Sequence, residues 1–298
     1  MLRPKTRIPA VLAFFLAAVF LVAALSGCGA KNKAKALLKI NELKKMVLLV
    51  PPAMENQNTC GESFSGVFKA TLSSGAKGVV FVTDPTLAGI FSFDPASITG
   101  PAPGQALLAQ ARAGGFNAIC LGRFSGPFIT QKKTGLYGFR KVRKVGEVLC
   151  SLWIYDTLTG AKILDLSLSR ETVLDETWPG QALEVLACPE DVLTDLAEDA
   201  ADQAFEALSE LPWSCQVLSV DGETVTLSAG ADAGLTTYIT LNVHSRGEEM
   251  PGKKGRVYLV PGAKSATVRV TSVSEKTATA QLLSGNPVNP GDWVFLKK

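Results

Sequence analysis

The segment Leu25-Ser26-Gly27-Cys28 carries the residues whose chemistry is most easily named. Small residues lead into a cysteine at the end of an apolar run from Ile8 to Leu25, and basic residues precede that run. This order is typical of a bacterial export signal. We therefore expect residues 1–27 to be a signal peptide and Cys28 to be acylated as the first mature residue. The alternative is an uncleaved anchor, because the run approaches the ~18 apolar residues that span a membrane.

Two short motifs hint at a serine acyl-transfer site of the penicillin-binding type. Ser74 and Lys77 form an S-x-x-K pair, and residues 133–135 spell K-T-G. Ser74, however, falls at the end of an expected helix rather than at its start. The carboxylates of 171–176 and 190–210 could do acid–base chemistry, but those of the helix are expected to form a solvated face. We expect no catalytic residues.

The cysteines that follow the lipobox have no spacing that suits a zinc site. Cys120 and Cys150 lie in apolar strand-like runs, where a buried free thiol is expected. Cys60 and Cys188 each precede a helix, and export permits a disulfide between them. Cys215 is not expected to pair with Cys188, because a helix between them would hold them ~30 Å apart.

The chain has one histidine, His244, and no companion that would complete a catalytic triad or a metal site. We expect this histidine at the surface near a strand end. The nucleophile elbow, the Walker A loop and the dinucleotide fingerprint are missing from the sequence. We therefore expect neither a metal nor a cofactor.

The charge of the mature chain is balanced. Without the three basic residues that precede Cys28, 27 basic and 27 acidic residues remain. Nucleic-acid binding needs a concentrated basic face, so we expect no nucleic-acid partner. The strongest local run is 126–146, which is basic, contains no acid and is expected to be a hairpin or loop. It is either a solvated loop or a partner surface, and the contact residues we expect there are Lys132, Lys133, Arg140, Lys141 and Arg143.

The hydrophobic periodicity predicts two domains after a basic tether at 28–45. Residues 46–210 alternate strands and helices, and residues 211–298 contain only short strands separated by glycine turns. The fold class is therefore α+β, with a mixed α/β sandwich domain followed by a small all-β, SH3-like barrel. Strands are expected over 46–50, 79–82, 118–122, 147–156 and 161–170, and helices over 61–73, 104–113 and 189–210.

Several stretches resemble a family of bacterial envelope domains. They are Met46–Val50, Phe116–Phe124 with Asn117 where the family has an acid, and the D-x-x-T-G turn Asp156–Gly160. The family includes the amino-terminal domain of the translocation protein TolB, the curli-secretion channel lipoprotein and the middle domain of flagellar assembly protein T. Val217–Leu235 and Gly291–Val294 also resemble the carboxy-terminal barrel of flagellar assembly protein T. The resemblance implies a TolB N-terminal-like first domain and an SH3-like barrel.

Together these features predict a non-enzymatic, lipid-anchored envelope protein that binds other envelope proteins or assists assembly, with flagellar or secretion processes implied by the resemblance. Gly29, in place of an aspartate, favours the outer membrane, with the protein facing the periplasm. One alternative is a homo-oligomeric secretion-channel component, although the basic run 126–146 lacks the alternation of a pore strand. The other alternative is a peptidoglycan-active hydrolase or another envelope enzyme.

Overall fold

The computed structural model describes residues 43–51, 53–54, 59–75, 78–88, 102–135, 141–177, 190–252 and 256–297. These residues belong to one compact unit, Leu43–Lys298. The signal peptide, Cys28 and most of the tether lie outside the described residues. Among the helices that are described, none combines the length and the apolar character that a membrane crossing requires.

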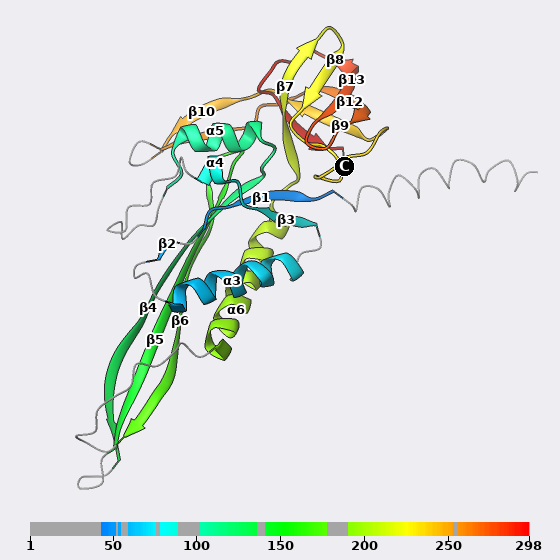
Figure 1. Ribbon diagram of the computed structural model, residues 1–298. Helices are drawn as coiled ribbons and strands as arrows, with labels where there is room; N and C mark the ends of the chain where they lie inside the picture. Colours follow the sequence, from blue (N-terminus) through cyan, green and yellow to red (C-terminus); the bar gives the residue numbers. More distant parts are fainter. Residues whose placement is uncertain are drawn as a thin grey trace, which may run out of the picture. The chain divides into compact units, whose positions relative to one another are not determined.

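A mixed sheet forms the centre of the α/β part (Figure 1). Its path runs β3-β1-β4-β5-β6, and the short β2 pairs with β4. β1 is parallel to β3 and β4, whereas β5 and β6 are antiparallel additions. The strands are β1 (Lys45–Leu49), β2 (Ala53–Met54), β3 (Val79–Val82), β4 (Ala118–Thr134), β5 (Lys141–Asp156) and β6 (Lys162–Thr177).

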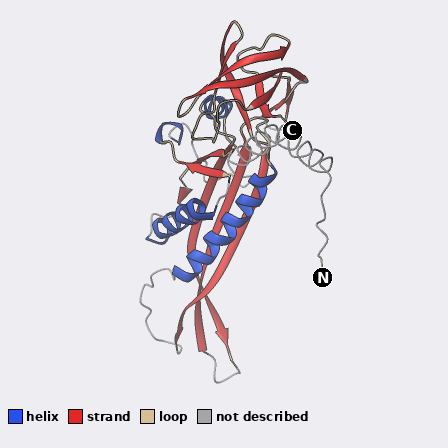
Figure 2. Cartoon of the chain, turned by 90° about the vertical axis from the view of Figure 1, so that its right-hand side faces the viewer, coloured by secondary structure: helices blue, strands red, loops and turns tan. Residues whose placement is uncertain are grey.

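Helices cover the two faces of this sheet (Figure 2). The helices are α3 (Thr59–Gly75), α4 (Pro85–Ala88), α5 (Gln105–Ala113) and α6 (Glu190–Glu210). Val47 and Leu49 pack in one core cluster with α3 and α6, while Leu48 packs in another with α5. Successive side chains of a strand point to opposite faces, so β1 is buried and apolar at every position after the leading Lys45. This explains the continuous apolar run in the sequence.

The three antiparallel strands are longer than the sequence predicts. Strands expected over 118–122 and 147–156 extend into β4 and β5, which pair until Thr134 faces Lys141. The run 126–146 is therefore a hairpin, and its arms continue the sheet. Its charges do not stop the pairing, because alternate side chains of a strand can point into water while the backbone remains hydrogen-bonded.

A β-bulge allows β4 to continue past the helices. The register with β5 shifts between Ser125 and Phe128. Gly126 has a φ of 108°, and a Cβ at this position would lie 2.6 Å from the Glu147 carbonyl oxygen. A side chain is excluded here, so glycine is the residue that lets the strand bend at this point.

The second part of the chain is a closed barrel in the order β12-β13-β8-β7-β14-β9. Closure pairs every edge of the barrel sheet, as expected for a small all-β domain. The barrel strands are β7 (Ser214–Asp221), β8 (Thr224–Leu227), β9 (Thr240–His244), β12 (Lys264–Val273), β13 (Ala278–Gly285) and β14 (Trp293–Leu296). A separate hairpin pairs β10 (Glu248–Pro251), which the sequence did not predict, with β11 (Val257–Val260). The TolB-like and SH3-like assignments remain predictions.

Asn117 joins the α/β part to the barrel. Its side chain is 3% exposed. Its Oδ1 accepts a hydrogen bond from the Met46 amide at 2.9 Å, and its Nδ2 donates to the Ser214 carbonyl at 2.7 Å. Its own carbonyl accepts from the Thr157 hydroxyl at 2.9 Å. An aspartate at this position could accept from Met46 but has no donor for the Ser214 carbonyl, so only the amide satisfies both partners.

We expect Asn117→Asp to lower the free energy of unfolding by about 1–3 kcal/mol, because Ser214 loses its donor and a carboxylate is placed beside its carbonyl. Urea denaturation at neutral pH measures the change. Asn286→Asp, at an exposed position in the barrel, is the matched control and should cost less than about 0.5 kcal/mol. Equal stability of the Asn117→Asp and wild-type proteins would show that this junction does not depend on the amide.

Candidate interaction surfaces

The far ends of β4, β5 and β6 form a three-stranded arm. We define the arm as Phe128–Thr134, Lys141–Glu147 and Glu171–Thr177. Figures 1 and 2 show these strands continuing past the ends of α3 and α6. The register places Phe128, Glu147 and Glu171 side by side across the three strands. The arm therefore brings together residues that lie more than forty positions apart in the sequence.

The described part of the predicted contact set lies on this arm. Lys132 and Lys133 are exposed on β4, and Arg143 is exposed on β5. Lys141 begins β5, but its side chain lies outside the described residues, as does the whole of Arg140. The role of these residues in binding a partner stays a prediction.

The third strand adds acids to the basic run. The Lys132 ammonium lies 2.6 Å from a Glu171 carboxylate oxygen, and the register places Arg143 opposite Glu176. The side chains of the Lys132–Glu171 pair are 52% and 54% exposed, so water screens the pair and it contributes less than about 1 kcal/mol to stability. The arm is consequently a surface of mixed charge. The sequence run 126–146, taken alone, indicated a purely basic one.

Apolar side chains also reach solvent on the arm. Phe128, Ile129 and Val173 are 42%, 60% and 55% exposed. The register pairs Thr130 with Val145 and Val145 with Val173, so Phe128 and Val173 share a face and Ile129 lies on the other. Exposed apolar residues rimmed by charges are typical of a protein-binding surface. The sequence alone indicates only the cations of this surface.

A second candidate surface surrounds His244, which the sequence placed at the exposed surface. In the structure the side chain is only partly exposed. Its ring stands edge-on to Phe295 with 5.1 Å between centroids, and its Nδ1 lies 3.1 Å from the Gly262 carbonyl oxygen. Nearby, Trp213 is 8% exposed and joins a core cluster with Met46.

Buried charges near the barrel have structural partners. The Arg112 guanidinium lies 5.9 Å from the centroid of the Trp293 ring, and burial lowers its pKa. Asp156 accepts hydrogen bonds from the backbone amides of Leu158 and Thr159 and from the Thr159 hydroxyl, as the D-x-x-T-G turn predicts. Burial raises the pKa of Asp156, and these hydrogen bonds oppose that rise. The carboxylate is engaged by its own turn, which indicates a structural role.

The serine motif does not gather into a site among the described residues. The Ser74 hydroxyl, in the last turn of α3, donates to the Thr71 carbonyl at 3.0 Å, and Lys77 lies outside the described residues. The described ranges also contain no cluster of histidine, cysteine and acidic side chains that could hold a metal ion.

The cysteines follow the sequence prediction where they are described. Cys120, Cys150 and Cys215 are buried free thiols. Burial raises the pKa of Cys150 to about 12 and raises the pKa values of the other two thiols as well. Cys60 is disulfide-bonded. Its predicted partner, Cys188, lies outside the described residues, so this pairing stays a prediction.

We expect the three buried thiols to resist iodoacetamide in the folded protein, because the thiolate is the reactive form and burial disfavours it. In urea without reductant all three should react, and Cys60 should react only after reduction. Peptide mapping by mass spectrometry identifies each alkylated position. Cys188→Ala should make Cys60 reactive without reductant. A Cys60 that stays blocked in this variant would show that the predicted pairing is wrong.

Comparison with known proteins gives only distant likenesses. No protein-family model and no curated protein sequence matches this chain. The PelC dodecamer from Paraburkholderia phytofirmans is 18% identical, with a TM-score of 0.29 over 53% of this chain and 84% of that chain. Lipoprotein GNA1162 from Neisseria meningitidis is 15% identical, with a TM-score of 0.32 over 54% of this chain and 99% of that chain. TolB from Acinetobacter baumannii is 10% identical, with a TM-score of 0.29 over 83% of this chain and 51% of that chain.

These TM-scores are all below 0.5, so the likenesses carry no argument about this protein. The resemblance to flagellar assembly protein T likewise remains a prediction from the sequence. Any functional conclusion must come from the chain's own residues.

Proposed function

We propose that this protein is a lipid-anchored, non-enzymatic component of the bacterial cell envelope that binds a partner protein through its arm. The lipobox at Leu25–Cys28 supports the anchor, and Gly29 supports an outer-membrane position facing the periplasm. Acyl chains contribute ~0.8 kcal/mol per buried methylene, so more than one chain on Cys28 would give stable attachment. Covalent labelling of Ser74 by a penicillin probe would contradict the non-enzymatic part of the proposal.

The proposal rests on the observation that the arm lies outside the hydrophobic core. No arm residue belongs to the core clusters formed by the described residues. Ordering a residue's backbone costs about 1–2 kcal/mol of conformational entropy, which core residues offset by burying apolar area. The arm is long and ordered, but its residues are not part of the core. Another requirement, such as partner binding, is therefore expected to maintain it.

The chemistry of the arm defines the partner. On one face of the arm, Phe128 and Val173 present apolar side chains beside the Lys132–Glu171 pair. On the other face, Ile129 lies beside Lys133. A complementary surface carries acidic groups around an apolar patch. Such an interface would take its orientation from the charges and most of its affinity from the apolar contacts. We propose a protein surface of this kind as the partner.

We expect charge reversal of the arm to abolish partner capture without unfolding the protein. The variant carries glutamate at the predicted contact residues Lys132, Lys133, Arg140, Lys141 and Arg143. Crosslinking in intact envelopes, followed by purification and mass spectrometry, measures capture. The wild type should enrich a specific envelope protein at least about tenfold over the variant, because like charges across an interface repel.

A control variant distinguishes the effect of reversing charges on the arm from the effect of changing the net charge of the protein. Lys264, Arg269 and Lys276 are exposed on the barrel, and their reversal to glutamate changes the charge in the same direction. This control should capture the partner as the wild type does, and circular dichroism should show both variants folded. Equal capture by the arm variant and the control would contradict the proposal.

A second candidate function, a self-assembling secretion component, is favoured by β6. This strand is 16 residues long and ends the path of the sheet. An unpaired strand edge can pair with a strand of another chain. Light scattering of the detergent-extracted protein distinguishes the candidates, because a discrete mass of several chains favours assembly and a single-chain mass favours the partner-binding protein.

A further inference from the structure

The outer edge of β6 has no neighbouring strand among the described residues. β6 ends the path of the sheet, and β5 pairs with it on its inner side. We consider Lys162–Arg170, the part of β6 that precedes the arm. Backbone groups of other described elements form no hydrogen bond with this part. The N–H and C=O groups of an open edge can be completed by an extended strand of another chain.

This edge has little of the protection that edge strands usually have. β6 is 16 residues long and contains no proline, and Asp165 is the one charge between the ends of the segment Lys162–Arg170. Leucines alternate along one face, pack against the core and remain partly exposed; they are Leu164, Leu166 and Leu168. Natural edge strands are usually short, interrupted or covered. We therefore expect another chain to cover this one.

Two contacts show how α6 is turned over the sheet. Phe205 stands edge-on to Phe81 of β3, with 5.9 Å between ring centroids, so the side of α6 that carries Phe205 faces the β3 end of the sheet. Asp199 forms an ion pair with Arg170 of β6, so the side that carries Asp199 faces the β6 end. We call this second side the β6 flank of α6.

The helical repeat assigns two exposed glutamates to opposite sides of α6. Residues seven apart share a side, because two turns of a helix take about 7.2 residues. Glu206 follows Asp199 by seven and therefore lies on the β6 flank. Glu198 precedes Phe205 by seven and therefore lies on the other side. Both glutamates are exposed, so they form a matched pair that differs in position.

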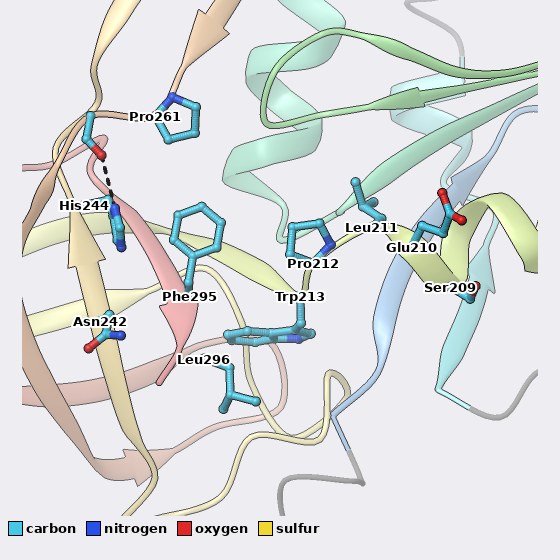
Figure 3. A pocket seen from close by; sticks show the side chains of 11 residues that line it. Ser209, Glu210, Leu211, Pro212, Trp213, Asn242, His244, Pro261, Phe295 and Leu296 are labelled. Atoms are coloured by element: carbon cyan, nitrogen blue, oxygen red, sulfur yellow. Dashed lines mark hydrogen bonds between the residues drawn. The ribbon is translucent and has the colours of Figure 1, made fainter. Parts of the chain in front are cut away.

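The β6 flank carries a row of carboxylates at helical spacing: Asp195, Asp199, Glu206 and Glu210. The row ends at Glu210, which borders a groove of about 850 Å³ around His244 and directs its carboxylate away from that histidine (Figure 3). α6 contains eight acidic residues and no basic one. Within the row, Asp199 alone has an ion pair with a described residue.

The row is unfavourable for α6 in the free protein. Like charges four residues apart on a helix repel each other, as Glu206 and Glu210 do. Acids near the carboxyl end of a helix also oppose its dipole, which is negative at that end. A cationic ligand on the β6 flank would offset both effects.

Charge distinguishes between the chains that could cover the edge. A second copy pairing through its own β6 would bring a second acidic α6 beside the first, and like charges across an interface repel. A strand with lysine or arginine on the face that meets α6 would attract the row instead. The aliphatic stems of those side chains can cover apolar surface while their charged ends reach the carboxylates. The chemistry therefore favours a cationic partner strand.

We propose that the edge Lys162–Arg170 binds an extended segment of a partner polypeptide that carries lysine or arginine at alternate positions. The segment adds a strand to the sheet, its cations meet the carboxylates of the β6 flank, and their stems pack on the exposed parts of the leucines. This edge shares no residue with the arm, so failure of either proposal leaves the other standing.

Isothermal titration of the full chain in non-ionic detergent micelles tests the proposal with two capped peptides of seven residues. One alternates lysine with threonine, and the other has glutamate in place of each lysine. The lysine peptide should bind at least about tenfold more tightly, because only its charges are complementary to the row. Equal affinities would overturn the proposal. So would no binding of either peptide, the result expected if a second copy already covers the edge.

A third peptide tests strand addition itself. It is the lysine peptide with every backbone nitrogen methylated, so it keeps the charges but cannot donate main-chain hydrogen bonds. We expect its binding to be at least about tenfold weaker, because main-chain hydrogen bonds supply affinity when a strand is added to an edge. Undiminished binding would show that the peptide only lies on the acidic helix, and would overturn the proposal.

The matched glutamates locate the binding. Glu206→Gln removes one carboxylate from the β6 flank, and Glu198→Gln removes one from the other side of the same helix. We expect Glu206→Gln to weaken the lysine peptide by about three- to fivefold, the effect of one exposed charge pair. Glu198→Gln should leave the affinity unchanged. Equal effects of the two variants would contradict binding at the β6 edge.

Discussion

The hydrogen bonds of Asn117 are the constraint on which the arrangement of the α/β part and the barrel depends. One buried amide accepts from β1 and donates to the first residue of β7, while the backbone of the same residue accepts from the turn between β5 and β6. Elements that are widely separated in the sequence thus meet at one side chain. Because a buried amide must satisfy both of its ends, the two parts cannot shift relative to one another without leaving polar groups unpaired.

Close packing reinforces this junction. Gly115 has a φ of 80°, and a Cβ at this position would lie 2.0 Å from the Ser228 carbonyl oxygen of the barrel. The Leu259 amide donates to the Thr159 carbonyl, which ties the β10–β11 hairpin to the turn that Asp156 organises. A fixed junction of this kind holds the strands that form the arm in place. It also builds the groove around His244, whose lining comes from both parts.

Local features of the fold could be predicted from the sequence. The apolar run Met46–Val50 indicated a strand buried on both faces, and Asp156–Gly160 indicated the hairpin turn between β5 and β6. The length of the arm could not be predicted, because charges and glycines in 126–146 resemble a loop when the pairing partner is unknown. Glu171 lies 39 residues from the lysine that it pairs with, so the mixed charge of the arm depends on strand register.

The residues that gather around His244 could not be predicted from the sequence either. Trp213, His244 and Phe295 are scattered over the second part of the chain, and each alone is typical of a core or surface residue. Only barrel closure, which sets β9 beside β14, brings His244 and Phe295 together. By contrast, the burial of Cys120 and Cys150 could be predicted, since it follows from the apolar residues on either side of each cysteine.

Site-specific photocrosslinking in living cells tests the central claim, that the arm is where a partner protein binds. A photoreactive amino acid at Ile129 probes the arm, and the same amino acid at Thr271 probes an exposed position on the barrel. The account predicts one discrete crosslinked product with a different envelope protein from position 129 and none from position 271. No product from position 129, or the same product from both positions, would contradict it.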